Sequence, residues 1–139
     1  MIVVDTSVIL AYMNSGDTYR ESVCQWLDQE HEELITTPLI VAEADYLVSS
    51  LGGARAASAF RADLAIGAWL VEWWAGAIRT AVEIADRYAD RYLGLADASL
   101  VAVAERVETV DIATLDERHF RTLAPQSGGT SFRLLPMDR

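Results

Sequence analysis

An apolar, β-branched run begins at the second residue of this 139-residue chain and stops at an acid. Ile2, Val3 and Val4 are followed directly by Asp5. A continuous apolar run of this kind predicts a strand buried on both faces, because a half-exposed strand alternates apolar with polar residues. In open α/β sheets, ligands bind outside the carboxyl ends of the strands. The sequence therefore places Asp5 at a ligand-binding edge.

The rest of the chain alternates strand and helix patterns. Further strands are expected at 34–36, 69–73, 110–113 and 132–135. Helices are expected at 8–13, 18–30, 38–51, 54–66, 78–92, 96–107 and 117–123, and Gly52-Gly53 separates the third from the fourth. No linker or repeat divides the chain, so residues 1–139 are expected to form one domain. The alternation predicts an α/β fold with a mainly parallel central sheet covered on both faces.

Composition narrows the class of protein. The single cysteine allows no internal disulfide, no apolar stretch approaches the ~20 residues of a membrane span, and no basic segment precedes the first apolar run. A cytoplasmic protein without membrane association is expected. The net charge is −10, and all 11 basic residues are arginine. Because non-specific nucleic-acid binding depends on positive charge, such binding is not expected here.

Glu43 stands in the predicted helix 38–51, where an acid is unexpected. The residues three and four positions away are all apolar: Leu39, Ile40, Tyr46 and Leu47. Residues at this spacing share a helix face, so Glu43 is expected on the stripe that packs on the core. A buried carboxylate needs a partner, and this helix has no arginine to pair with it.

Three other acids have an alternative interpretation as helix caps. Asp5, Asp97 and Asp116 each precede or open a predicted helix, where a carboxylate satisfies free N–H groups and favours the helix dipole. Thr114 and Glu117 would then form a capping box, with Asp116 as an additional charge in the first turn. Considered one at a time, each of these acids is explained equally well as a helix cap or as part of a catalytic or metal-binding site.

Their joint occurrence favours a cation site. Asp5 and Asp116 follow strands, and Glu43 and Asp97 lie on helices expected to pack on the sheet. Residues 98–104 after Asp97 are almost all non-polar, so this helix is expected to be buried. Four neighbouring carboxylates cannot all stay charged without a cation, and a hard, oxygen-preferring ion explains them together. His31 and His119 have no partner at metal-ligand spacing and are expected on the surface, which makes zinc improbable.

These residues resemble a known family in order, spacing and chain length. The matching positions are Asp5-Thr6-Ser7 after the first strand, Glu43 on the third helix, Leu95-Ala96-Asp97-Ala98 opening a buried helix, and Thr114-Leu115-Asp116 followed by Phe120. Together they resemble the PIN-domain ribonucleases, and most closely the VapC toxins of bacterial toxin–antitoxin pairs. The resemblance covers essentially the whole chain.

The resemblance implies a three-layer α/β/α fold and RNA cleavage that depends on Mg²⁺ or Mn²⁺. It also implies a toxin homodimer and an antitoxin whose C-terminal segment occupies the active-site groove. The family's acidic positions correspond to Asp5, Glu43, Asp97 and Asp116. The hydroxyl groups expected to orient these carboxylates are those of Thr6, Ser7 and Thr114.

The mechanism expected from this resemblance is hydrolysis by water. Asp5 and Asp97 are the expected direct metal ligands, and Glu43 and Asp116 complete the shell directly or through water. The ion would polarise the scissile phosphate and activate a bound water for in-line attack. The expected products carry a 5′-phosphate and a 3′-hydroxyl.

Binding of RNA by so acidic a protein requires a local positive rim. The four arginines near the predicted site in sequence are candidates for this rim: Arg87, Arg91, Arg118 and Arg121. An equally good interpretation is that they lie on ordinary solvent-exposed helix faces. Weak non-specific binding favours recognition of shape in a folded RNA, such as an exposed loop. Three tryptophans are expected in the core or at a dimer or antitoxin surface, with base stacking a third interpretation: Trp69, Trp73 and Trp74.

Two other classes of protein are alternatives to a nuclease. Receiver domains and haloacid-dehalogenase-type phosphatases also carry an early strand-end aspartate, but both depend on a lysine, and this chain has none. A non-catalytic binding scaffold is the stronger alternative. Within the enzymes, a PIN-like nuclease of RNA maturation without an antitoxin is the alternative to a toxin.

Overall fold

A computed structural model describes residues 1–126 and 128–139 and confirms the predicted α/β architecture. Five strands form one sheet in the order β3-β2-β1-β4-β5, and every neighbouring pair is parallel. The strands are β1 Ile2–Val4, β2 Leu34–Thr36, β3 Leu70–Val71, β4 Asp111–Ala113 and β5 Arg133–Leu135. The central strand β1 is buried throughout, as its continuous apolar run predicts.

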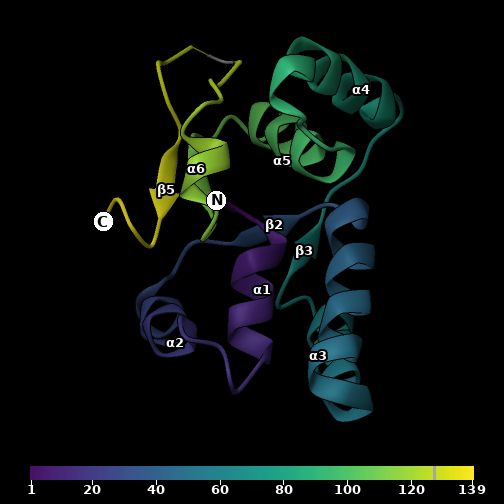
Figure 1. Cartoon of the computed structure of the whole chain (residues 1–139), viewed down its shortest axis with the longest axis vertical. Coiled ribbons are helices and arrows are strands. Elements are labelled where there is room, and N and C mark those ends of the chain that lie inside the picture. Colours follow the sequence, from purple (N-terminus) through teal and green to yellow (C-terminus); the bar gives the residue numbers. More distant parts are fainter. Residues whose placement is uncertain (127) are drawn as a thin grey trace.

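Helices flank the sheet in two groups (Figure 1). The helices are α1 Thr6–Met13, α2 Arg20–Gln29, α3 Pro38–Ala65, α4 Ala77–Arg87, α5 Leu95–Arg106 and α6 Glu117–Phe120, with a 3₁₀ turn at Ala89–Arg91. In the figure α4 and α5 lie together at the top, and α1, α2 and α3 lie in the lower part, with strands between the two groups. The described residues include no helix long and apolar enough to cross a membrane.

The long helix α3 is interrupted where the sequence predicts a break. Gly53 has φ 75° and ψ −172°, a conformation that only glycine adopts readily. The first half of α3 carries Glu43, and the second half begins after this interruption. The predicted boundary between the helices 38–51 and 54–66 is therefore confirmed as a kink.

The segment between α3 and α4 differs from the prediction of a strand at 69–73. Only Leu70 and Val71 pair with β2, at the edge of the sheet. Trp69 instead points into the core, where it is 4% exposed and its ring meets Tyr12 edge-on at 6.0 Å. Trp74 is half-buried, and the guanidinium of Arg106 lies 4.8 Å from the centre of its ring. Trp69 therefore belongs to the core, whereas Trp73 and Trp74 contact each other, with ring centroids 6.0 Å apart.

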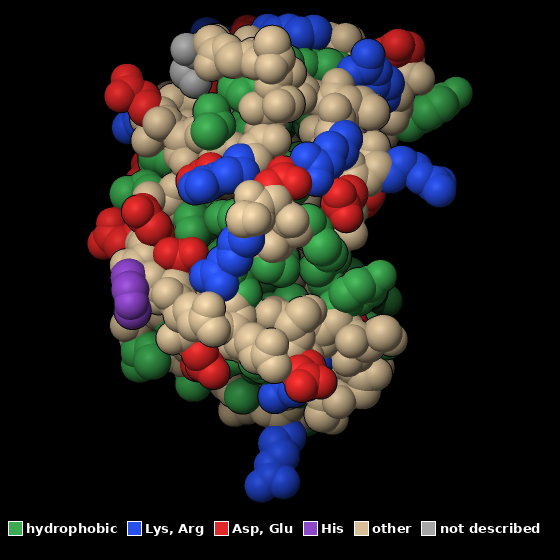
Figure 2. All heavy atoms as spheres, turned by 90° about the vertical axis from the view of Figure 1, so that its left-hand side faces the viewer, with side chains coloured by type: hydrophobic (Ala, Val, Ile, Leu, Met, Phe, Trp, Pro, Cys, Tyr) green, Lys and Arg blue, Asp and Glu red, His purple; other side chains and the backbone are tan. Residues whose placement is uncertain are grey.

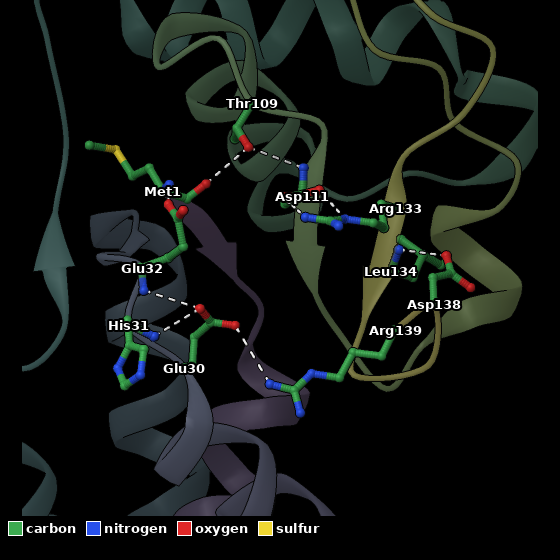
Figure 3. A network of polar contacts seen from close by, with 10 residues as sticks. All are labelled: Met1, Glu30, His31, Glu32, Thr109, Asp111, Arg133, Leu134, Asp138 and Arg139. Atoms are coloured by element: carbon green, nitrogen blue, oxygen red, sulfur yellow. Dashed lines mark hydrogen bonds and ion pairs between the residues drawn. The ribbon is translucent and has the colours of Figure 1, made fainter.

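A polar network occupies the end of the sheet where the strands begin (Figure 3). The Thr109 hydroxyl donates a hydrogen bond to the Met1 carbonyl, just before β1. Asp111 and Arg133, the first residues of β4 and β5, form an ion pair across the two strands. The Glu30 carboxylate accepts hydrogen bonds from the backbone N–H groups before β2. These contacts hold the amino ends of the strands together, opposite the carboxyl ends that carry the acids.

Candidate active site

The centre of the candidate site is the junction between the carboxyl ends of β1 and β4. These strands are neighbours, with Val4 paired to Ala113, so Asp5 and Thr114 emerge side by side. The Asp5 N–H donates to the Ala113 carbonyl at 2.9 Å. The Thr114 hydroxyl donates to Oδ2 of Asp5 at 2.8 Å. Parallel pairing thus brings two segments from opposite ends of the chain into direct contact.

Asp5 is the most buried of the four acids, with 5% of its surface exposed. It precedes α1, but its side chain makes no capping hydrogen bond. Instead Oδ2 accepts a second hydroxyl bond, from Ser7 at 2.6 Å. Burial raises the pKa of Asp5, and the hydrogen bonds from Ser7 and Thr114 oppose that rise. The capping interpretation therefore does not account for this carboxylate.

Glu43 reaches the same edge from α3, but the expectation that it is buried is wrong. The buried stripe of this part of the helix is Ile40, Ala44 and Val48, and Glu43 lies on the exposed side of it. Tyr46, one of the apolar neighbours that suggested a core position, is 71% exposed. Glu43 nevertheless has a partner, because the Thr6 hydroxyl donates to its Oε2 at 2.6 Å.

Two buried hydroxyl groups connect the helix of Glu43 to the helix of Asp97. Thr37, the N-cap of α3, accepts a hydrogen bond from the Ile40 N–H, and its hydroxyl lies 2.8 Å from that of Ser99 on α5. Ser99 also donates to the Ala96 carbonyl at 2.6 Å. Neither residue was predicted to support the site. The Thr37-Pro38 pair was a detectable helix-start signal, but its contact with Ser99 exists only in the folded chain.

Asp97 lies in the first turn of α5, and residues 98–104 of this helix are buried as expected. Its side chain is 26% exposed. Burial, followed by the nearby charge of Asp5, raises the pKa of Asp97 to about 6; Glu43 and Asp116 add to the rise, and His119 opposes it. The charges of Asp5, Glu43 and Asp116 therefore all act on Asp97 at one edge of the sheet.

Asp116 both caps α6 and faces this edge. Its Oδ1 accepts a hydrogen bond from the His119 N–H at 3.2 Å. The predicted capping box of Thr114 and Glu117 is wrong, because the N-cap is Asp116 itself. The Thr114 hydroxyl instead accepts the Asp116 N–H at 3.0 Å while donating to Asp5.

His119 is the residue at this site that the sequence did not reveal. The expectation of a surface histidine is wrong: its side chain is only 25% exposed, and Nδ1 lies 3.4 Å from Oδ2 of Asp97 and 3.7 Å from Oδ2 of Asp116. The signal available in the sequence was its position three residues after Asp116. That spacing places the two on one side of a helical turn.

The predicted substrate-binding arginines have different environments. Arg91 and Arg118 line a cavity of about 580 Å³ together with Asp116, His119 and Thr122. Arg91 also donates to the Thr122 carbonyl. Arg87 is exposed at the end of α4.

Arg121 is held by two carboxylates, at 2.6 Å from Asp138 and 2.9 Å from Glu117. Figure 2 shows the face around α2, β5 and the C-terminal segment, where acidic and basic side chains are interspersed. A continuous positive area is not seen on that face. The cavity lined by Arg91 and Arg118 adjoins one of the acids, Asp116.

The donor set at this edge fits a hydrated divalent cation. In the described parts of the chain, no three His, Cys, Asp or Glu side chains come together as a set of direct metal ligands. Mg²⁺ usually keeps several waters and is held by one or two carboxylates, so a closed cage is not required. A buried Asp5 and an Asp97 with a raised pKa carry a charge that burial disfavours and that a cation would stabilise.

Comparison with known proteins agrees with this geometry. The family model of the PIN domain matches residues 2–124. The chain is 39% identical over 136 residues to "Ribonuclease VapC26" of Mycobacterium tuberculosis, covering 97% of this chain and all of the relative. The chain therefore belongs to the PIN-domain ribonucleases, in the VapC toxin family.

Two solved structures share the fold. VapC20 of Mycobacterium tuberculosis, described as a sarcin–ricin loop cleaving toxin, matches with a TM-score of 0.79 at 24% identity, over 86% of this chain and 92% of that one. FitAcB of Neisseria gonorrhoeae matches with a TM-score of 0.59 at 24% identity, over 86% and 91% of the two chains. The arrangement of strands and helices is thus shared with proteins of low sequence identity.

Proposed function

We propose that this protein is a Mg²⁺-dependent endoribonuclease that acts as the toxin of a type II toxin–antitoxin pair, with Mn²⁺ as an alternative ion. The observation that carries the proposal is the Asp5 carboxylate, which is buried beside Asp97 and held by the hydroxyls of Ser7 and Thr114. Burying a charged group without a cationic partner is costly unless the site binds a cation. Membership of the PIN-domain ribonucleases supports the reaction.

Each polar residue of the site has a defined part in this proposal. Asp5 and Asp97 would bind the ion, and Glu43 and Asp116 would complete its shell directly or through water. When bound, the ion supplies Lewis acidity at the phosphate and lowers the pKa of a bound water. Ser7 and Thr114 both donate to Oδ2 of Asp5, so Oδ1 would remain free to bind the ion. Thr6 fixes Glu43 in the same way.

The substrate proposed is a folded RNA with an exposed loop. The chain has a net charge of −10, so attraction to any RNA is weak, and shape must contribute to selection. Arg91 and Arg118 line the cavity beside Asp116 and are the first choices for contacts to RNA phosphates. Arg87 is exposed and is a further candidate for the rim, whereas Arg121 is paired with Asp138 and Glu117 and would have to exchange these partners to bind RNA.

Family membership also supports a cytoplasmic homodimer inhibited by an antitoxin in the active-site groove. A nuclease of RNA maturation without an antitoxin is the alternative. A small adjacent reading frame for a DNA-binding partner, whose product binds this protein and stops cleavage, favours the toxin. Full activity in the presence of that product favours the alternative.

The decisive experiment maps new 5′ ends in total cellular RNA incubated with the protein and Mg²⁺ or EDTA. Cleavage is expected only with Mg²⁺, leaving 5′-phosphate and 3′-hydroxyl ends. Asp5→Asn and Asp97→Asn should abolish it, whereas Asp45→Asn should not, because Asp45 pairs with Arg61 outside the site. Cleavage by both site variants at the parent rate would leave a non-catalytic scaffold as the better account. A 2′,3′-cyclic phosphate product would rule out water attack.

A further inference from the structure

His119 occupies a position between two acids of the site that its exposed-looking sequence context did not suggest. Its ring nitrogen Nδ1 lies 3.4 Å from Oδ2 of Asp97 and 3.7 Å from Oδ2 of Asp116. Both separations are ion-pair distances and lie outside the usual N–H···O hydrogen-bond range, so the ring acts on the two carboxylates by close electrostatic approach. Asp97 belongs to α5 and Asp116 precedes α6, so His119 connects acids from two separate elements.

The imidazole is held in this position from several sides. The backbone N–H of His119 donates to Oδ1 of Asp116, so backbone and ring contact the two oxygens of one carboxylate. The ring packs beside that of Phe120, with centroids 6.1 Å apart, and Phe120 is 1% exposed in the core. The second nitrogen, Nε2, is buried and has no hydrogen-bond partner in the described residues. The nitrogen available to the acids is therefore Nδ1.

An imidazole nitrogen that faces two carboxylates carries a proton, whether the ring is neutral or cationic. An Nδ1–H group at these distances attracts one oxygen of each acid and leaves the other oxygen free. Groups that orient metal-binding side chains in this way typically change metal affinity by 10–100-fold when removed. No other arginine or histidine forms an ion pair with Asp97 or Asp116 in the residues that the structure describes.

We propose that His119 is a positioning residue whose Nδ1–H orients the carboxylates of Asp97 and Asp116 for binding of the divalent cation. The inference rests on the proposed metal-dependent function and adds to it a residue outside the four acids. His119 is neither a metal ligand nor an acid or base in this account. Its effect passes through Asp97 and Asp116.

The test measures binding of Mn²⁺ alone by isothermal titration calorimetry, without RNA. His119→Ala should weaken Mn²⁺ binding by roughly tenfold to a hundredfold. His119→Asn places its amide N–H₂ near the position of Nδ1 and should bind within a few-fold of the parent. His119→Gln places its amide near the position of Nε2 and should resemble the alanine variant. His31→Ala, at the chain's other histidine, which is exposed, should leave binding unchanged.

A second measurement separates positioning from direct chemistry. Because His119 acts through cation binding, excess Mn²⁺ should restore RNA cleavage by His119→Ala. Circular dichroism and thermal unfolding verify that each variant is folded. If His119→Ala does not fold, the comparison of His119→Asn with His119→Gln still tests the proposal.

Several outcomes would overturn the proposal. Parent-like Mn²⁺ binding by all the His119 variants would do so and would leave the proposed nuclease function intact. Better binding by His119→Gln than by His119→Asn would show that Nε2 is the important atom. Cleavage by His119→Ala that stays low at saturating Mn²⁺ would indicate that His119 acts on the RNA. Failure of the parent to bind Mn²⁺ would remove the proposed function itself, and this inference with it.

Discussion

Replacing Asp97 by asparagine is expected to stabilise the protein when no divalent cation is present. Asp97 is mostly buried at the start of α5, and burial and the charge of Asp5 raise its pKa from 3.8 to about 6. At neutral pH the folded chain must therefore keep a carboxylate charged where its charge is disfavoured. Asparagine has nearly the same shape and carries no charge, so it removes this cost.

The magnitude follows from the pKa difference between the unfolded and the folded chain. A rise of roughly two pKa units corresponds to about 3 kcal/mol, at ~1.4 kcal/mol per unit. That value is an upper limit, because the side chain is 26% exposed and solvent screens part of the repulsion. A carboxylate in the first turn also favours the helix dipole by up to ~1 kcal/mol, which asparagine gives up. We expect Asp97→Asn to raise the free energy of unfolding by about 1–2 kcal/mol.

The stability that Asp97→Asn gains over the parent should increase with pH. Between about pH 4 and pH 6 the folded parent binds a proton at Asp97 that the unfolded chain has lost, because the folded pKa is the higher one. The parent therefore loses stability as pH rises through this window, and the variant lacks this contribution. The difference between the two proteins should be absent below pH 4, grow up to pH 6 and stay constant above it.

Urea unfolding in EDTA at a series of pH values measures this difference. Asp45→Asn is the matched control, because hydrogen bonding by Arg61 lowers the pKa of Asp45 and the substitution should give no gain. Saturating Mg²⁺ should reverse the order at pH 7, since the parent binds the ion more tightly than the variant. A destabilised Asp97→Asn protein at pH 7 without metal, or a gain that persists below pH 4, would refute the reasoning.

Three further results are expected. Thr114→Val should lower the free energy of unfolding, measured in urea, by about 1–3 kcal/mol, because the buried Asp5 carboxylate loses a hydrogen bond. The control Thr80→Val, which removes an exposed hydroxyl bond, should have little effect. Equal losses in the two variants would contradict the hydrogen bond from Thr114 to Asp5. Glu108→Gly should raise thermal stability by ~1 kcal/mol, because Glu108 has φ 56° in the Schellman motif that ends α5. Glu105→Gly, inside the same helix, should lower the free energy of unfolding by a similar amount. A less stable Glu108→Gly protein would refute the argument from the positive φ of Glu108. Mg²⁺ should raise the melting temperature of the parent but not of Asp5→Asn, and equal shifts would exclude Asp5 as a ligand.

The fold was largely predictable because apolar runs of different length separate strands from helices. The three apolar residues before Asp5 form the buried central strand, and the longer run after Asp97 forms the buried helix α5. Parallel strands place their carboxyl ends at one edge, which is why Asp5 and Thr114 meet. The strand expected at 69–73 was too long, since no local pattern shows that Trp69 turns into the core.

The details of the site were less predictable, because they depend on which side of each helix packs. Apolar neighbours suggested that Glu43 is buried, but the helix also carries apolar residues on its exposed side, including Tyr46 and Leu51 at 71% and 61% exposure. Periodicity cannot identify the buried stripe when several faces are apolar. His119 contacts Asp97 only because α5 and α6 meet at the sheet edge.

The four acids of the site differ from those carboxylates that the protein pairs with arginine. Elsewhere, some carboxylates are paired with arginine, as in Arg61–Asp45, Arg121–Asp138 and Arg133–Asp111. In the described residues, Asp5, Glu43, Asp97 and Asp116 form no ion pair with arginine, and their partners are hydroxyl groups and one imidazole. A hydroxyl group fixes one oxygen of a carboxylate without cancelling its charge, whereas an arginine would occupy both oxygens. The protein thus orients these acids and leaves their negative charge for a cation that it does not itself supply.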